Sequence, residues 1–145
     1  MSEIDKETLE SLRLAFSRLD SNFAQGLKKE TAELFTEEAR LMWPGMDDIV
    51  GREAIEAAFG EFFKEFDTLA FSPDRQIVEL CGSKVFTIGR FLEDLAPKAG
   101  GSAQRVHGRL VEMWRQSKHG EWQLGLMLTG RYAENEMLTE KSASV

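Results

Sequence analysis

The sequence predicts an α+β domain, in which antiparallel strands form one sheet and helices cover one of its faces. Three observations support this prediction. Apolar residues recur at the helical spacings of three and four along the first half of the chain. Segments rich in β-branched and aromatic residues follow, separated by glycine-containing turns. The last two segments, 104–116 and 122–132, flank the polar turn SKHGE and form a long hairpin that needs helices to cover it.

Three helices are predicted in the first half of the chain. The first covers residues 4–25, where Asp5 can cap the start and Gly26 can end the helix. Its apolar stripe consists of Leu9, Leu12, Phe16, Leu19 and Phe23. A short second helix covers 28–35, and a third covers 52–66. The apolar stripe of the third helix consists of Ile55, Phe59, Phe62, Phe63 and Phe66.

The strands are predicted from the turn residues that separate them. A first short strand, 37–43, ends at Pro44-Gly45. A second, 69–81, contains Pro73, which places its first part at a sheet edge or in a bulge. A third covers 84–93, and 95–103 is predicted to be a loop before the final hairpin. Residues 1–132 therefore form a single domain, and 133–145 form a tail expected to be flexible.

Composition excludes several classes of function. The net charge is -7 and the pI is near 4.9, so an acidic surface would repel nucleic acid. No apolar run is long enough to span a membrane, and the N-terminus is too polar for a signal peptide. Cys81 is the only cysteine, and a buried free thiol is expected there. These features predict a cytoplasmic protein that binds neither nucleic acid nor membrane.

Two runs of sequence resemble a known family. The run LFTEEARLMWPGMDDIVGREAIEAAF is similar to the family's strand, Pro-Gly turn and helix start. The run GRLVEMWRQSKHGEWQL resembles its last hairpin. The family is the SnoaL-like or ketosteroid-isomerase-like group of the nuclear-transport-factor-2-like (cystatin-like) superfamily. The resemblance implies a cone-shaped, curved antiparallel sheet wrapped around the long first helix, with two further helices and a pocket at the wide end. It also implies a homodimer.

The resemblance implies acid–base chemistry in an apolar pocket, without a cofactor. Trp43 stands where ketosteroid isomerases have their catalytic Asp, which argues against that reaction because an indole accepts no proton. Ligand-binding candidates in the resulting pocket are Phe16, Asp20, Trp43, Phe59, Phe63 and Met127. For each Phe the alternative is ordinary core, and for Asp20 it is an exposed position beside the helix stripe.

Two residues are the candidate catalytic groups. Glu112 is the one carboxylate in the middle of the final hairpin, and Leu110 and Trp114 would raise its pKa if it faces the cavity. A solvated or cross-strand-paired Glu is the alternative. His107 lies five residues away, on the opposite face of a regular strand, unless a bulge at Gly108 intervenes.

The resemblance leaves two functions open. The first is a pocket for a small apolar molecule, with isomerase, cyclase or dehydratase activity if the protein is an enzyme. The second is a non-catalytic homodimeric association domain with a closed cavity. A homodimer is expected in either case, because both faces of the final hairpin are apolar and only one can cover the helices. No metal site is predicted, since two His and one Cys stand at unrelated spacings.

Overall fold

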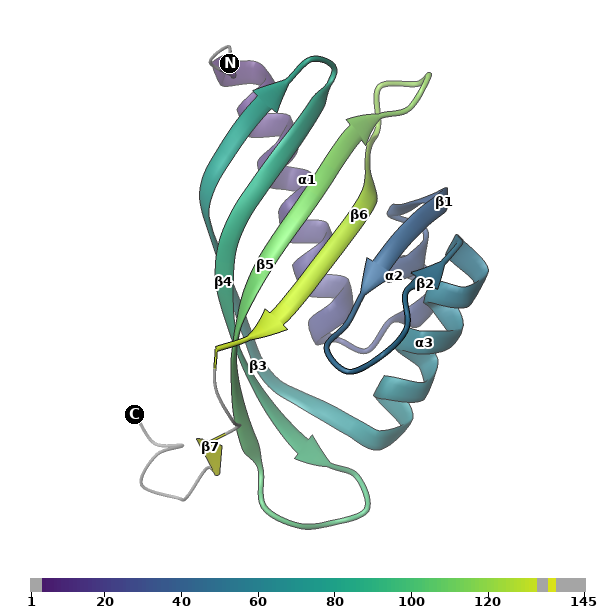
Figure 1. The fold of residues 1–145 in the computed structure, drawn as a ribbon, viewed down its shortest axis with the longest axis vertical. Coiled ribbons are helices and arrows are strands. Elements are labelled where there is room, and N and C mark those ends of the chain that lie inside the picture. Colours follow the sequence, from purple (N-terminus) through teal and green to yellow (C-terminus); the bar gives the residue numbers. More distant parts are fainter. Residues whose placement is uncertain (1–3, 133–135, 138–145) are drawn as a thin grey trace.

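A computed structural model describes residues 4–132 and 136–137 of the chain. The helices are α1 (Lys6–Ala24), α2 (Lys28–Ala32) and α3 (Arg52–Glu65). The strands are β1 (Phe35–Met42), β2 (Ile49–Val50), β3 (Phe66–Cys81), β4 (Lys84–Pro97), β5 (Gln104–Gln116), β6 (Trp122–Arg131) and β7 (Glu136–Met137). The order of elements confirms the predicted α+β class, with helices in the first half and long strands in the second (Figure 1).

The long first helix begins and ends as its sequence predicts. The Asp5 side chain caps it by accepting a hydrogen bond of 2.8 Å from the backbone N–H of Thr8. The chain leaves the helix at Gly26, whose φ of 71° suits glycine. Leu12 and Leu19 are buried on its inner face, and Trp122 at the start of β6 donates a 2.7 Å hydrogen bond to the Ser11 hydroxyl. These contacts fix α1 against the sheet.

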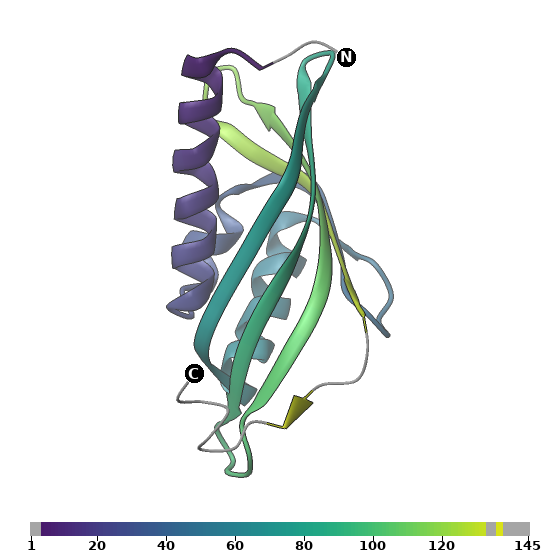
Figure 2. The ribbon, with the colours of Figure 1, turned by 90° about the vertical axis from the view of Figure 1, so that its left-hand side faces the viewer.

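The sheet has the order β2-β1-β6-β5-β4-β3, and β7 pairs with β5. It curves around the helices, with β3 and β4 running along most of the molecule's length (Figure 2). The predicted sheet is wholly antiparallel, but β1 pairs with β6 in parallel, so the sheet is mixed. The parallel pairing follows from the chain path, because α3 and the three following strands separate β1 from β6. β3 lies at an edge, as Pro73 predicts.

Several predicted boundaries are wrong. The third helix ends at Glu65, and Phe66 is already the first residue of β3, which the prediction begins at residue 69. The second helix ends at Ala32, and Phe35 already belongs to β1. The predicted loop 95–103 is shorter, because β4 continues to Pro97 and Leu95 pairs with Gln104 of β5. Pro97 is tolerated there because it is the last residue of its strand. The longer β4 keeps Glu93 inside a regular strand.

The core lies between the helices and the concave face of the sheet. Its largest fully buried side chains include Trp114, Phe35 and Phe59. Arg52, the first residue of α3, donates two hydrogen bonds of 2.9 and 2.6 Å to the backbone carbonyl of Phe35, which joins α3 to β1. The single cysteine, Cys81, is exposed at the β3–β4 turn rather than buried as predicted, because the turn projects beyond the core.

Part of the sequence-based prediction lies outside the described residues. The flexible tail predicted over 133–145 is one such case, since only the two residues of β7 are described there. None of the described helices combines the length and the apolar composition that a bilayer crossing requires.

Candidate functional site

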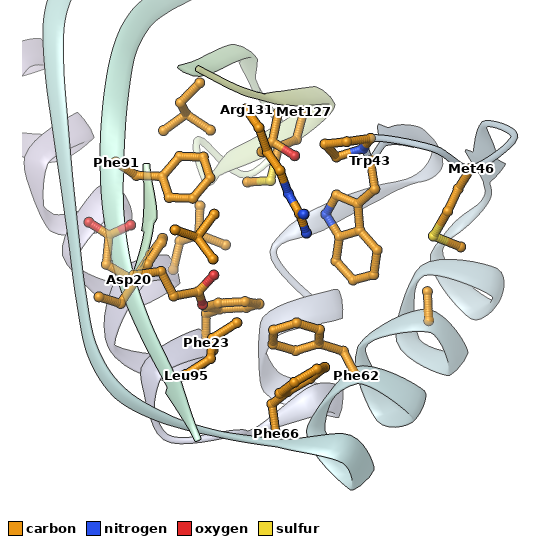
Figure 3. Close-up of a pocket in the computed structure, with 18 of the residues that line it drawn as sticks. Asp20, Phe23, Trp43, Met46, Phe62, Phe66, Phe91, Leu95, Met127 and Arg131 are labelled. Atoms are coloured by element: carbon orange, nitrogen blue, oxygen red, sulfur yellow. The ribbon is translucent and has the colours of Figure 1, made fainter. Parts of the chain in front are cut away.

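A cavity of about 470 Å³ opens between α1, α3, the loop after β1 and the inner face of β3 to β6. Figure 3 shows Phe23, Phe62 and Phe66 on one side of it and Trp43 on another. The aromatic side chains that line it are Phe23, Trp43, Phe62, Phe66, Phe71 and Phe91. The same wall carries a small number of polar groups. This combination is typical of small-molecule sites.

Strand β3 directs Arg75 into the cavity through two changes of register. The pairing of β3 with β4 gains one extra residue between Thr68 and Ala70 and another between Arg75 and Ile77. Each extra residue reverses which side chains face inward, so Arg75 lies inside and Val78 is inward again after it. The opposite residue, Gly89, admits no side chain, since a Cβ there would lie 2.0 Å from the carbonyl oxygen of Asp74. The register shift therefore depends on a glycine.

Strand β6 uses a third register shift. One extra residue, Gly125, lies between the pairs Met113–Leu126 and Trp114–Leu124. Before the shift, Trp122 and Leu124 are buried in the core. After it, Met127, Thr129 and Arg131 line the cavity. The shift thus directs the second half of β6 toward the ligand space.

Arg75 holds two carboxylates at the base of the cavity. Its Nε donates a 2.7 Å hydrogen bond to Glu112 Oε1, and its Nη2 donates to Glu112 Oε2 at 3.2 Å. Its Nη1 and Nη2 donate to the two oxygens of Asp20 at 2.9 and 2.8 Å. The guanidinium also lies 4.4 Å from the centre of the Phe16 ring. Asp20, Arg75 and Glu112 are called the floor cluster below.

Glu112 has further donors and no exposed surface. Its Oε1 also accepts hydrogen bonds from the Thr87 hydroxyl at 2.8 Å and from Trp114 Nε1 at 3.1 Å. The residue is fully buried. Four hydrogen bonds therefore hold the buried Glu112 side chain in one position.

The floor cluster shifts the pKa of two of its members. Burial raises the pKa of Asp20, and the hydrogen bonds and positive charge of Arg75 partly oppose this effect. The two carboxylates raise the pKa of Arg75 above its usual range, although burial acts in the opposite direction. The guanidinium is therefore positively charged.

Glu93 is a cavity carboxyl whose surroundings differ from those of Asp20 and Glu112. It lies on β4, is only 7% exposed, and its Oε2 has no hydrogen-bond partner among the described residues. Burial raises its pKa to about 7, which Arg131 partly counteracts and the neighbouring Asp94 reinforces. Asp94 itself pairs with Arg105 at 2.8 Å. Glu93 is thus a cavity carboxyl that gains or loses a proton near neutral pH.

Arg131 is the second cation of the cavity wall. Figure 3 shows its side chain reaching from β6 toward the indole of Trp43. Within the described part of the chain it makes no ion pair, although its charge lowers the pKa of Glu93. It is exposed at the mouth of the cavity, where it can meet an oxygen atom of a ligand.

The structure brings four of the predicted site residues together. Asp20, Trp43, Glu112 and Met127 line the cavity. The ligand-binding role predicted for the three Phe residues is not supported by their positions. Phe16, Phe59 and Phe63 pack in the core, where Phe16 meets Trp114 edge to face with ring centres 5.3 Å apart. These residues lie on the apolar stripes of α1 and α3 and pack into the core, so they do not face the cavity opening.

The structure separates His107 from Glu112. β4 and β5 pair without interruption from Gln104 to Arg115, so no bulge occurs at Gly108. His107 is exposed on the outer face of β5 and does not line the cavity. Gly108 instead makes room for a cavity residue, since a Cβ there would lie 2.4 Å from the Phe91 ring. His107 and Glu112 therefore form no joint site.

The residues predicted for the site did not include Arg75 or Glu93. Glu93 had a usable signal, because it shares the alternation of Val85 and Phe91 along β4. Arg75 had none, since its inward direction depends on a register shift that reverses the alternation of β3. No group of three or more metal-binding side chains occurs within residues 4–132 and 136–137.

Comparison with known proteins identifies the family. A SnoaL-like domain model matches residues 17–124. A search of curated proteins finds no match. Among solved structures, a ketosteroid isomerase-like protein from Erwinia carotovora atroseptica SCRI1043 has a TM-score of 0.81 at 18% identity, covering 90% of this chain and all (100%) of the other. A candidate scytalone dehydratase from Novosphingobium aromaticivorans DSM 12444 has a TM-score of 0.80 at 10% identity, covering 90% of this chain and 87% of that one.

A third similar solved structure is named as an association domain and not after a reaction. It is a candidate calcium/calmodulin dependent protein kinase II association domain from Xanthomonas campestris, with a TM-score of 0.68 at 19% identity over 90% of this chain and 91% of the other. At these identities the structural matches show the fold alone. The domain match spans most of the chain, and the chain therefore belongs to the SnoaL-like family.

Proposed function

We propose that the protein binds a small apolar molecule in its cavity and transfers a proton to or from it, with Glu93 as the acid–base group. The Glu93 carboxyl carries this proposal. It is buried, lines the cavity, has one oxygen without a partner in the described structure, and has a pKa of about 7. Groups that transfer protons at neutral pH need a pKa in this range.

Arg131 is placed to stabilise the negative charge that such a proton transfer creates on the ligand. Removing a proton from a carbon beside a carbonyl group leaves negative charge on the carbonyl oxygen, and that oxygen needs a cation or a donor. Arg131 lines the same cavity and interacts electrostatically with Glu93. The aromatic wall lowers the effective dielectric around the buried Glu93 and strengthens the electrostatic interactions of that carboxyl. Isomerisation, cyclisation and dehydration are the reactions that these groups support.

The proton-transfer proposal is tested by deuterium exchange. Bicyclic ketones with acidic C–H bonds, beginning with 2-tetralone, are incubated in D₂O with the protein, and exchange at the carbon beside the carbonyl is followed by proton NMR. The wild type should accelerate exchange, with a rate that rises through pH 7 as Glu93 ionises. Glu93→Gln should lower the rate by roughly a hundredfold or more, the usual contribution of a general base.

Glu79→Gln is the matched control for this experiment. Glu79 is an exposed carboxylate on β3, outside the cavity, so the same substitution there should leave the exchange rate unchanged. An unchanged rate in Glu93→Gln would contradict the role of Glu93. A wild-type rate equal to that of buffer across the ketone series would contradict proton transfer itself.

A second candidate function is non-catalytic association. The similarity to the Xanthomonas campestris structure favours it, as does an apolar outer sheet face with four exposed side chains, Ile77, Phe86, Ile88 and Leu128. A second copy of the chain would cover this face. Light scattering at micromolar concentration should give a dimer, and a monomer would contradict the proposed interface. Association alone requires neither an open cavity nor a buried carboxyl that lines it. The cavity and Glu93 therefore favour the first candidate.

A further inference from the structure

Acidic groups outnumber basic ones around the cavity. The carboxyl groups that line it are Asp20, Glu61, Glu65, Glu93 and Glu112, and the guanidinium groups are Arg75 and Arg131. An anionic ligand would therefore enter against net negative charge. Among the described residues that line the cavity, Arg131 at the mouth is the one cation that a ligand could reach, because Arg75 is only 8% exposed. The charge balance favours a neutral ligand.

The floor cluster presents an acceptor to this ligand. Arg75 already uses four of its five N–H donors on Asp20 and Glu112, so little donor capacity remains. Each oxygen of Asp20 accepts one of these bonds, whereas a carboxylate can accept about four in all. The Asp20 side chain is 23% exposed and lines the cavity, while Glu112 is fully buried. Asp20 is therefore the side chain of the floor cluster that a ligand can contact.

We infer that Asp20 accepts a hydrogen bond from a hydroxyl group of the ligand, so the cavity selects neutral ring compounds that carry a hydroxyl. This inference rests on the proposed function and names its substrate class. The hydroxyl meets Asp20, while the reacting part of the ring system faces Glu93 on β4. Arg75 disfavours a ligand ammonium at the same place because it already supplies the positive charge there.

The cluster suits recognition because Asp20 is held in advance. Two hydrogen bonds from one guanidinium fix the orientation of its carboxylate. Glu112 and the Phe16 ring fix the guanidinium in turn. A preorganised acceptor loses little conformational entropy when the ligand binds. Asp20 is therefore a specificity residue, and Arg75 and Glu112 are positioning residues.

Calorimetric titration with three naphthalene compounds tests the inference. The compounds are 2-naphthol, its methyl ether 2-methoxynaphthalene, and 2-naphthoate. The ether keeps the ring and oxygen but lacks the donor, and the naphthoate carries negative charge. The wild type should bind 2-naphthol about tenfold or more tightly than the ether, as expected for a hydrogen bond to a charged acceptor. The naphthoate should bind most weakly.

Asp20→Asn identifies the acceptor. Asn replaces one of the two acceptor oxygens with an N–H₂ donor, and Arg75 occupies the oxygen that remains, so the preference for 2-naphthol over the ether should fall to about twofold or less. Glu79→Gln should keep the wild-type preference. Carbon NMR of the Asp20 carboxyl in the wild type needs no variant, and 2-naphthol but not the ether should shift its resonance.

The outcomes separate this inference from the proposed function. If 2-naphthol and the ether bind equally, or Asp20→Asn keeps the preference, Asp20 is not the acceptor, and the role of Glu93 still rests on deuterium exchange. If the naphthoate binds best, Arg131 rather than Asp20 selects the ligand and the inference is wrong. If all three compounds fail to bind, the cavity does not select hydroxylated ring compounds and the inference is wrong, whereas the proposed function is still decided by deuterium exchange.

Discussion

Glu112 and Glu93 are two glutamates on neighbouring strands that line the same cavity, yet their surroundings differ. Glu112 accepts hydrogen bonds from Arg75, Thr87 and Trp114. Glu93 has an oxygen without a partner in the described structure and a pKa of about 7. Both are buried, so burial alone does not make a carboxyl reactive. The supply of donors separates a carboxylate that holds structure from one that exchanges protons.

The largest expected effect comes from removing the cation of the floor cluster. Arg75→Met leaves Asp20 and Glu112 in a buried site without their counter-charge, and should lower the free energy of unfolding by roughly 3–5 kcal/mol. Urea unfolding, followed by tryptophan fluorescence, measures this change. Arg90→Met on the outer face of β4 is the control, since Arg90 is more than half exposed and its nearest pairing distance is 4.0 Å.

Glu93→Leu tests whether the Glu93 carboxyl, unlike the floor cluster, contributes nothing to stability. Its Oε2 has no partner in the described structure, so the substitution should leave stability unchanged or higher at pH 8, where the wild-type carboxyl is ionised. A loss in Glu93→Leu as large as that in Arg75→Met would mean that both carboxyls are structural, and the distinction between them would be lost.

The next effect is a pH dependence of stability from Glu93. Its pKa rises from 4.5 to about 7 on folding, so between these values the folded chain binds the proton and the unfolded chain does not. The free energy of unfolding therefore falls as pH rises through this window and is level above it. The contribution is about 3 kcal/mol at most, from the size of the shift.

Glu93→Gln removes this titration and provides the test. The difference in unfolding free energy between the variant and the wild type should shift in favour of the variant from pH 4.5 to pH 8. Measuring both proteins at each pH cancels the contributions of all other groups. A difference that stays constant over this range would show that Glu93 does not titrate with the raised pKa.

The sequence predicts one of these glutamates better than the other, for a physical reason. Glu112 lies in the middle of a predicted strand, so the sequence names it as a candidate, but both faces of that hairpin are apolar and the face that Glu112 occupies is settled only by the structure. The predicted preceding strand ends at Glu93, so Glu93 is not recognised there as an inward-facing residue. In the structure β4 continues to Pro97, and Glu93 follows the regular alternation of that strand. Strand ends are set by pairing with distant segments, and the local sequence does not encode this pairing.

The two arginines of the cavity are a harder case. Arg75 and Arg131 face inward only because an extra residue reverses the alternation of β3 and of β6. The helices, the final hairpin and the α+β class follow from periodicity and turn residues, which are local. The position of a bulge depends on close packing between strands, such as the backbone of Asp74 against Gly89. Sequence patterns therefore predict the frame of this site more reliably than its charged groups.

The smallest expected effect tests the role of donors with a pair of hydroxyl groups. Thr87 and Thr36 are both buried, but the Thr87 hydroxyl donates to Glu112 at 2.8 Å, and the Thr36 hydroxyl has no partner among the described residues. Thr87→Val should cost about 1–2 kcal/mol in urea unfolding, because it removes a donor from a buried charge. Thr36→Val should be neutral or stabilising. Equal costs in the two variants would mean that lost packing, rather than the bond to Glu112, determines the effect, and the comparison between the two glutamates would lose its physical basis.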